Sequence, residues 1–180
     1  SASISMIGPD GQYAAFARHG DYVGRSRVSF KAVTWGSLEA FEAARMTGQR
    51  DPSCTGCTLD AAIEVVHEFL PARSAPEASQ FLFTYRVTIA NESTETVQLL
   101  ARLWIITDAE GREERVEGPG VVGETPVLAP GARHVYSSFC PLPTPVGTME
   151  GCYRMVVVAS GERFDTAIGR FTLAVPGAVN

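Results

Sequence analysis

From residue 81 onward, apolar and polar side chains alternate along the chain with a period of two. Every second position between residues 81 and 89 is apolar, and these positions are Phe81, Phe83, Tyr85, Val87 and Ile89. Polar side chains stand between them, at Thr84, Arg86 and Thr88. A period of two is typical of a strand that buries one face, so the pattern predicts a half-buried β-strand.

Residues 97–107 continue the alternation, but both sides of this segment are apolar. One side carries Val97, Leu99, Ala101, Leu103 and Ile105, and the other carries Leu100, Trp104 and Ile106. This pattern predicts a central strand that is covered on both faces, with Trp104 in the core. Asp108 to Gly111 form a turn signal, so residues 112–117 are expected to return antiparallel as a hairpin.

Four further apolar runs, at 62–70, 132–139, 152–159 and 162–174, are separated by turn signals. The signals are Pro130-Gly131, the segment from Pro141 to Gly147, and Ser160-Gly161. Roughly seven strands spaced by turns, with no helical period after residue 60, predict an all-β fold. We expect an immunoglobulin/fibronectin III-like antiparallel β-sandwich, whose strand order the spacing leaves open.

The first 57 residues have a different pattern of apolar positions. Apolar positions at helical spacing follow Ser37, a favourable N-cap residue, and Gly48 lies where such a helix would end. This pattern predicts one short helix near 37–47. We therefore divide the chain into an N-terminal extension or arm, residues 1–57, and a sandwich domain, residues 58–180.

Several separated blocks between Phe81 and Leu173 resemble the ApaG family closely. The blocks are Tyr85–Asn91, Leu100–Asp108, Val116–Pro126, Leu128–Gly131, Tyr136–Ser138, Leu142–Met155 and Gly161–Phe164. With the strand expected at 62–70 included, the resemblance extends over residues 59–175. Because the blocks match in order and spacing, a chance likeness is excluded.

The resemblance implies a fibronectin type III-like sandwich of a kind found alone in bacteria and as a module in eukaryotic F-box and polymerase-delta-interacting proteins. In those settings it looks like a protein-binding domain. The chain departs from the family pattern at Gly169, where the family tends to place proline after the isoleucine. Residues 1–57 match no familiar companion domain, so the resemblance implies nothing about their role.

Charge is distributed unevenly along a chain whose net charge is −5. Residues 58–180 carry 9 arginines against 15 acidic side chains, whereas residues 1–57 carry 6 basic against 5 acidic. Nucleic-acid binding by the sandwich is therefore disfavoured, because phosphate contacts depend on clustered arginine and lysine. Only the arm, with Arg18, Arg25 and Arg27 close together, is a candidate for contacting RNA or an acidic surface.

No apolar stretch is long enough to span a membrane, and no secretory signal is visible, so an intracellular protein is expected. Residues 12–35 bear arginine and little acid, as an organelle transit segment does. A mitochondrial or other organellar location is therefore a second interpretation.

The glycine-rich segment 118–123 has the spelling G-x-G-x-x-G, with Gly118, Gly120 and Gly123 separated by Pro119, Val121 and Val122. In dinucleotide-binding folds this motif opens a helix, and no helical pattern follows it here. Three interpretations stay open: a loop that binds an anion such as a phosphate or nucleotide, a loop that binds a protein partner, and glycines with a structural role only. Glu117 and Glu124 flank the segment and would repel an anion.

Cys54 and Cys57 form a C-x-x-C pair, with Cys140 and Cys152 far along the chain. A zinc site needs four converging ligands, and a second such pair is absent from the sequence. A weak metal site, a disulfide or redox pair, and two ordinary thiols all stay open, and we expect no cofactor. His67 is expected to be a packed histidine in an apolar strand.

No serine lies in a G-x-S-x-G turn, and His19, His67 and His134 have no evident serine or cysteine partner. The sequence therefore predicts a non-enzymatic protein-interaction module. Its expected role is that of a small accessory subunit, which binds the other protein subunits of a larger complex in a mitochondrion or elsewhere in the cell. One alternative is a phosphate- or nucleotide-binding protein or hydrolase that uses the glycine-rich segment. A second alternative is a subunit that contacts RNA through the basic arm.

Overall fold

The computed structural model describes residues 61–178 and the backbone of four earlier strands, at residues 3–7, 14–19, 25–32 and 34–35. The earlier strands are β1 (Ser3–Ile7), β2 (Ala14–His19), β3 (Arg25–Ala32) and β4 (Thr34–Trp35). The later ones are β5 (Ala61–Phe69), β6 (Phe81–Asn91), β7 (Val97–Asp108), β8 (Glu113–Pro119), β9 (Val127–Leu128), β10 (Arg133–Leu142), β11 (Val146–Val157) and β12 (Arg163–Ala174). Within this described part the helical elements are two 3-10 turns, η2 (Pro71–Arg73) and η3 (Pro76–Ala78). The all-β prediction is confirmed.

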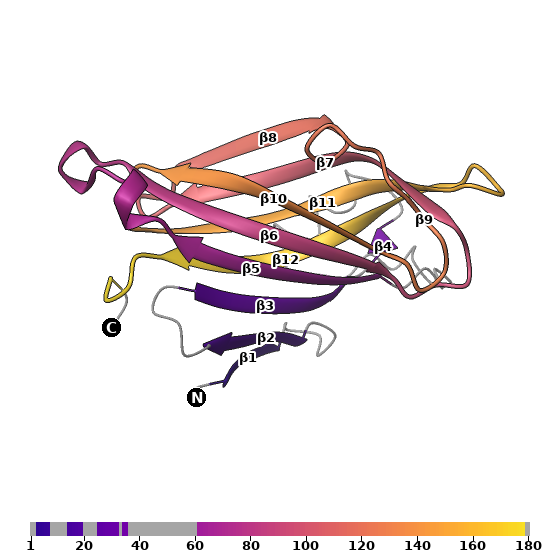
Figure 1. Cartoon of the computed structure of the whole chain (residues 1–180), viewed down its shortest axis with the longest axis horizontal. Coiled ribbons are helices and arrows are strands. Elements are labelled where there is room, and N and C mark those ends of the chain that lie inside the picture. The colour runs from indigo at the N-terminus through magenta and orange to yellow at the C-terminus, as the bar shows by residue number, and fades with distance from the viewer. Residues whose placement is uncertain (1–2, 8–13, 20–24, 33, 36–60, 179–180) are drawn as a thin grey trace.

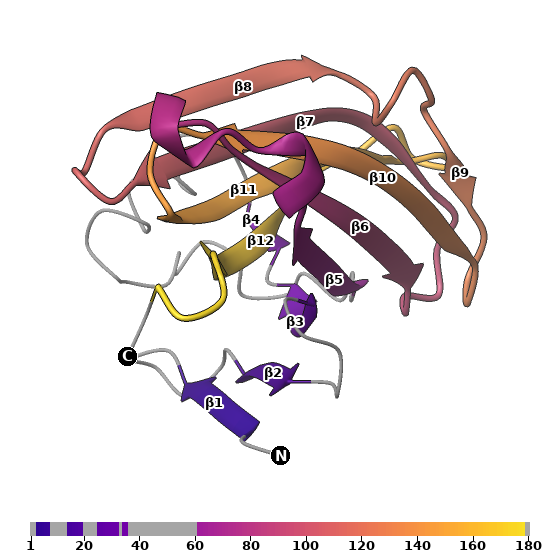
Figure 2. The same cartoon turned by 60° about the vertical axis from the view of Figure 1, so that its left-hand side comes forward.

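The strands form two facing antiparallel sheets. One sheet has the order β1-β2-β3-β5-β6-β10, and the other has the order β4-β12-β11-β7-β8, with β9 paired to β7. Figure 2 shows the strands of the first sheet following one another in this order. In Figure 1, β8 and β10 lie at the same border of the sandwich, and β1 lies at the opposite border. Strands β8 and β10 are therefore sheet edges, each with one hydrogen-bonded neighbour among the described strands.

The apolar positions of β6 lie in the core between the sheets, as their alternation predicts. Phe83 and Tyr85 are 1% and 5% exposed, and Val87 and Ile89 are fully covered. Trp104 is also buried in this core, where its ring lies edge-on to Tyr85 with 5.4 Å between ring centroids. The expected burial of these side chains is confirmed.

The alternation expected along β7 is wrong in one respect. Met155 pairs with Leu99 and Arg154 with Ala101, so the pairing to β11 skips Leu100. An extra residue of this kind reverses which side chains face the core beyond it. Leu99 and Trp104 therefore both belong to the core between the sheets, whereas the prediction put them on opposite faces.

The close approach of β11 to β7 depends on Gly151. A Cβ at this position would lie 2.0 Å from the carbonyl oxygen of Leu103, closer than any side chain tolerates. The pairing of β11 with β12 is also irregular here, between Met149 and Gly151. The hairpin predicted after Asp108 is present, with β8 antiparallel to β7.

The N-terminal strands join the sheets of the sandwich. β3 pairs antiparallel with β5, and β4 pairs with β12. These pairings cross the boundary that we predicted between an arm and a sandwich domain. The helix predicted near 37–47 lies outside the described residues.

Candidate functional site

The glycine-rich segment 118–123 begins with the last two residues of β8, and residues 120–123 form a tight loop after the strand. Gly120 has a φ of +60°, a left-handed conformation in which a Cβ would lie 2.3 Å from the carbonyl oxygen of Glu124. Val121 is fully buried, and Val122 beside it is 62% exposed. The loop is therefore anchored by one apolar side chain and displays the next.

Three backbone N–H groups of the loop are already engaged. Gly120 donates to the carbonyl oxygen of Leu100, while Val121 and Glu124 donate to each other's carbonyl oxygens. A phosphate-binding loop needs N–H groups that point at the ligand. These three are directed at carbonyl oxygens instead, which weakens the case for an anion site.

Arg102 of β7 holds the loop from the side. Its Nη1 donates to the carbonyl oxygens of Pro119 and Gly120, at 3.2 and 2.9 Å. A Cβ on Gly118 would lie only 3.1 Å from the same nitrogen. The absence of a side chain at Gly118 thus leaves room for the guanidinium group. Arg102 donates to carbonyl oxygens of its own chain at the loop.

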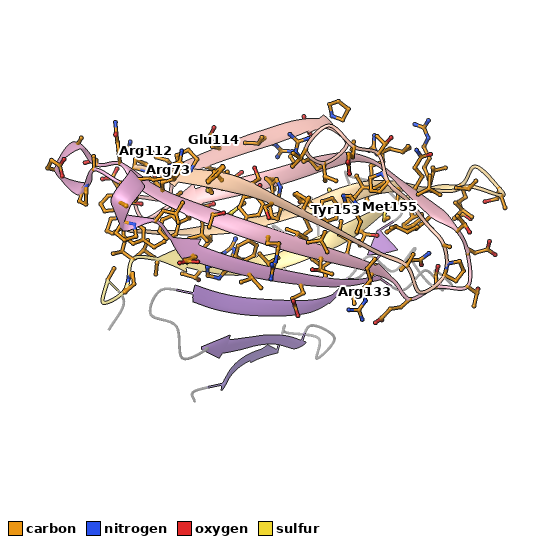
Figure 3. The ribbon with its side chains drawn as sticks, in the orientation of Figure 1. Arg73, Arg112, Glu114, Arg133, Tyr153 and Met155 are labelled. Carbon is orange, nitrogen blue, oxygen red and sulfur yellow. The ribbon has the colours of Figure 1, made fainter. Side chains whose placement is uncertain are left out.

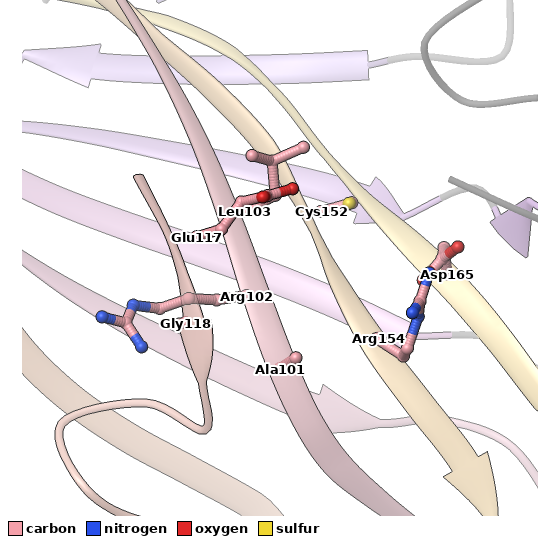
Figure 4. Close-up of a pocket in the computed structure, with 8 residues that line it drawn as sticks. All are labelled: Ala101, Arg102, Leu103, Glu117, Gly118, Cys152, Arg154 and Asp165. Atoms are coloured by element: carbon pink, nitrogen blue, oxygen red, sulfur yellow. The ribbon is translucent and has the colours of Figure 1, made fainter. Parts of the chain in front are cut away.

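A shallow depression of about 240 Å³ lies beside the loop, over β7, β8, β11 and β12 (Figure 4). Arg154 and Asp165 lie next to each other on one side of it, whereas Arg102 points away toward Gly118 (Figure 4). Arg154 Nε donates to Asp165 Oδ1 at 3.3 Å. Cys152 also lines the depression and is 3% exposed.

Burial dominates the electrostatics of Asp165, whose side chain is 4% exposed. Loss of hydration raises the pKa of this carboxyl group, and the neighbouring Arg154 guanidinium opposes that rise. Such a pair is typical of a structural ion pair, and a perturbed carboxyl needs a reacting partner before it suggests catalysis. Within residues 61–178, no group of three or more His, Cys, Asp or Glu side chains could hold a metal ion.

The two free sheet edges at this border of the sandwich differ sharply in charge. Edge strand β8 carries exposed charges at Glu113, Glu114, Arg115 and Glu117. Edge strand β10 carries no Asp, Glu, Lys or Arg after Arg133, and it exposes Val135 and Phe139 to 52% and 53%. Charged side chains protect a sheet edge from pairing with another chain, so β8 is protected and β10 is not.

A groove of about 430 Å³ adjoins the end of β10 that carries Pro141. It is lined mainly by apolar side chains, among them Phe81, Leu82, Pro141 and Pro143. Arg73 also lines it, and its guanidinium carbon lies 5.2 Å from the centroid of the Phe139 ring. Arg73 and Arg133 lie toward opposite ends of β10 (Figure 3), so the part of the strand without formal charge lies between two cations.

The arm residues that the sequence singled out fall on paired strands. Arg18 of β2 is in register with Arg27 of β3, and Arg25 is in register with Glu68 of β5. The basic segment therefore lies beside an acidic strand of the same sheet. Cys54 and Cys57 lie outside the described residues.

Sequence reasoning missed the most exposed apolar positions of β10, Val135 and Phe139. The signal was present, because residues 135–142 contain no formal charge, as the printed sequence shows. It also missed strand β3, although Val28, Phe30 and Ala32 alternate with polar residues. His67 was predicted correctly as a packed histidine: it is 6% exposed and stacks on Phe171.

Fold and site together define a fibronectin-like β-sandwich in which edge strand β8 is rich in charge and edge strand β10 carries no Asp, Glu, Lys or Arg after Arg133. The sequence model of the ApaG domain matches residues 71–157. Protein ApaG of Pseudomonas paraeruginosa is 51% identical over 118 residues, which cover 66% of this chain and 93% of that protein. Protein ApaG of Beijerinckia indica is 52% identical over 119 residues, 66% of this chain and 91% of that protein. The chain belongs to the ApaG family.

A solved structure agrees with this assignment. A Bordetella pertussis protein described as ApaA superposes with a TM-score of 0.64 at 44% identity, covering 66% of this chain and 96% of that one. The family resemblance and the sandwich fold predicted from the sequence are both confirmed. About a third of the chain lies outside each of these matches.

Proposed function

We propose that this chain is a non-enzymatic protein-interaction module that binds its partner along the edge strand β10. The observation that carries the proposal is the contrast between the two edges. Exposed glutamates lie along β8, whereas Val135 and Phe139 of β10 are each about half exposed on a strand that carries no Asp, Glu, Lys or Arg after Arg133. An uncharged edge with exposed apolar side chains is the kind of surface to which another chain adds a strand.

The groove beside Pro141 supports the same proposal. Edge pairing supplies affinity through main-chain hydrogen bonds, and side-chain pockets next to the edge supply specificity. Phe139, with Arg73 over its ring, offers an aromatic anchor at the mouth of such a pocket. Aromatic and arginine side chains are the groups that dominate binding energy in protein interfaces.

The sequence offered two candidate contact sites, the arm residues Arg18, Arg25 and Arg27 and the glycine-rich segment 118–123, and the proposal uses neither of them. Strands β3 and β4 are hydrogen-bonded into the sheets of their own chain, so their backbone groups are engaged there. A role as an accessory subunit of a larger assembly remains part of the proposal. The bacterial relatives give no support to a mitochondrial location, and an intracellular one stays a prediction. Among the described residues, no helix has the length and apolar character that crossing a membrane requires.

The test uses the full chain as bait for proteins from the cells that produce it. Any captured protein is then purified, and its dissociation constant is measured for the wild-type chain, V135E and V158E. Val135 and Val158 are both 52% exposed, which makes V158E a matched control. We expect V135E to weaken binding at least about tenfold and V158E to leave it unchanged. Equal binding by all three chains would reject the proposal, as would the failure to capture any protein, a second copy of this chain included.

The two alternatives have tests of their own. An RNA-contacting role for Arg18, Arg25 and Arg27 predicts an affinity that falls steeply with salt and disappears when residues 1–57 are deleted. A phosphate- or nucleotide-binding role, with or without hydrolysis, predicts shifts of the loop amide signals on adding ADP or pyrophosphate. We favour neither, because Arg25 is in register with Glu68 on the neighbouring strand and three loop N–H groups are engaged.

A further inference from the structure

The exposed side chains of β10 belong to the residues whose backbone groups face away from the sheet. In an antiparallel pair, alternate residues direct their N–H and C=O groups toward the partner strand and away from it. Pro141 has no N–H group, and proline fits an edge strand where its nitrogen faces outward. The carbonyl oxygen of Ser138 accepts a hydrogen bond from the Thr84 hydroxyl of β6, so the backbone groups of Ser138 are directed toward β6. Val135, Ser137 and Phe139 alternate with Ser138 in the same way as Pro141 does. Their backbone groups therefore face the open edge.

This set of outward-facing residues is symmetric about Ser137. Val135 lies two positions before it and Phe139 two positions after it, and the two side chains are almost equally exposed. If a second β10 approaches antiparallel with a twofold axis at Ser137, each Val135 lies opposite a Phe139. Aromatic and β-branched side chains form favourable cross-strand pairs. The same register places Arg133 opposite Pro141, so no like charges face each other.

Charge argues for this edge and against the other one. Strand β8 exposes Glu113, Glu114 and Glu117 and a single cation, Arg115, so pairing two copies through β8 would bring together two edges that are each net negative. The outward-facing residues of β10 between Arg133 and Pro141 carry no formal charge, so two copies meet without repulsion. They also carry no charge pattern by which a different chain would be preferred.

We infer that the partner of edge strand β10 is a second copy of this chain, paired antiparallel about Ser137. This inference rests on the proposed function and names the occupant of its binding edge. The two six-stranded sheets then become one continuous sheet, joined by about six backbone hydrogen bonds in the central part of the contact. One strand from each copy makes a contact smaller than the roughly 1,200–2,000 Å² of a stable interface, so the dimer is weak and forms with rising concentration.

The first experiment measures the mass of the full chain by sedimentation velocity over a range of concentrations. The wild-type chain and V158E are expected to shift from monomer to dimer, whereas V135E and F139E stay monomeric up to at least about tenfold higher concentration. Circular dichroism and unfolding midpoints show whether each variant is folded. A wild-type chain that stays monomeric throughout would overturn the inference.

The second experiment tests the register by disulfide trapping, with Cys54 and Cys57 replaced by serine. Residues opposite each other in a hydrogen-bonded pair are about 5.5 Å apart at Cα, within the range of a disulfide. S137C is therefore expected to cross-link to itself under mild oxidation. V135C and F139C are expected to cross-link when the two variants are mixed and not when each is alone. A dimer without these cross-links would overturn the inference, because it uses another surface.

The two proposals fail in different ways. If the chain is monomeric but V135E abolishes binding of a captured protein, β10 binds a different chain: the inference fails and the proposed function stands. If the chain is monomeric and β10 substitutions change no binding, both fail. If the traps form as described, the inference stands whatever further partner is found.

Discussion

Tyr136 of β10 and Tyr153 of β11 join the two sheets through a hydrogen bond between their hydroxyl groups. Tyr136 is 7% exposed and Tyr153 is fully buried. Trp104 lies edge-on to Tyr153, with 6.4 Å between ring centroids. The edge strand β10 is thus tied to the facing sheet by a polar contact inside the apolar core.

The first prediction concerns this tyrosine pair. Y136F removes one hydroxyl and leaves the other buried without its partner, which should lower the free energy of unfolding by about 1–3 kcal/mol. Removing both hydroxyls leaves no such group, so the double variant Y136F/Y153F should be more stable than the sum of the two single losses implies. Urea unfolding of the four chains measures this. Strictly additive losses would contradict it.

The same pair predicts a loss of stability in alkali. Burial raises the pKa of both hydroxyls, so the folded chain holds protons that the unfolded chain releases near pH 10. The contribution of each group is therefore fully present below the unfolded pKa and is lost as the pH rises above it. Unfolding free energies measured between pH 8 and pH 11 should fall for the wild-type chain and fall less for Y136F/Y153F.

The second prediction concerns Arg154 and Asp165. R154Q leaves a buried carboxyl group without its cation, and because Arg154 is 44% exposed we expect a moderate loss of about 1–2 kcal/mol at neutral pH. The pKa of Asp165 is already raised by burial, and losing Arg154 raises it further. The protonated carboxyl tolerates burial, so the loss should be smaller at pH 4.5 than at pH 8.

The control for this prediction is R112Q. Arg112 pairs with Glu110 on the surface, where the two side chains are 72% and 58% exposed. An exposed pair of this kind contributes roughly 0–1 kcal/mol, so R112Q should be close to neutral at both pH values. A larger loss for R154Q at pH 4.5 than at pH 8 would contradict the role assigned to burial.

The third prediction separates two glycines of the loop. Both have a positive φ, at +60° for Gly120 and +78° for Gly123, but only Gly120 is crowded by a backbone carbonyl. G123A should lower the unfolding free energy by about 1–2 kcal/mol, the penalty of a left-handed conformation. G120A should lose clearly more, because the loop has to shift as well. Equal losses in urea unfolding would show that crowding by Glu124 is unimportant.

The fourth prediction concerns the buried thiols in a chain that carries C54S and C57S. Burial raises the pKa of the Cys140 thiol to about 12, and Glu114 adds to the rise. The thiolate is the reactive form, so Cys140 should react with a thiol reagent only when the chain unfolds. Reagent kinetics at pH 8 with and without urea measure this. Rapid reaction of Cys140 in the folded chain would contradict it.

The strands from residue 61 onward could be predicted because their signals are local. Phe83, Tyr85, Val87 and Ile89 repeat every second residue, and this period matches the pleat of a strand whatever its neighbours are. The core position of Trp104 followed from the apolar composition on both sides of its segment. Its true face did not, because the residue skipped at Leu100 shows only in the pairing with β11.

The candidate binding site needed the tertiary structure. Arg73 and Phe139 are far apart in the sequence, and only the packing of η2 near β10 brings them together. Strand order decides which strands are edges, and order depends on pairings between distant segments that no local period encodes. For the glycine-rich segment the local signal was misleading. Its G-x-G-x-x-G spacing suggested an anion-binding loop, but in the structure the N–H groups of Gly120 and Val121 donate to backbone carbonyl oxygens.

From the order of residues alone came the β-sandwich, the buried face of β6 and the family, because alternation and separated motifs are properties of short stretches of chain. The folded structure was needed to show that β10 is an open edge, that Val135 and Phe139 lie exposed on it, and that β3 extends the same sheet. These features depend on which strands become neighbours. That choice is made by the collective burial of both sheets and not by any one segment.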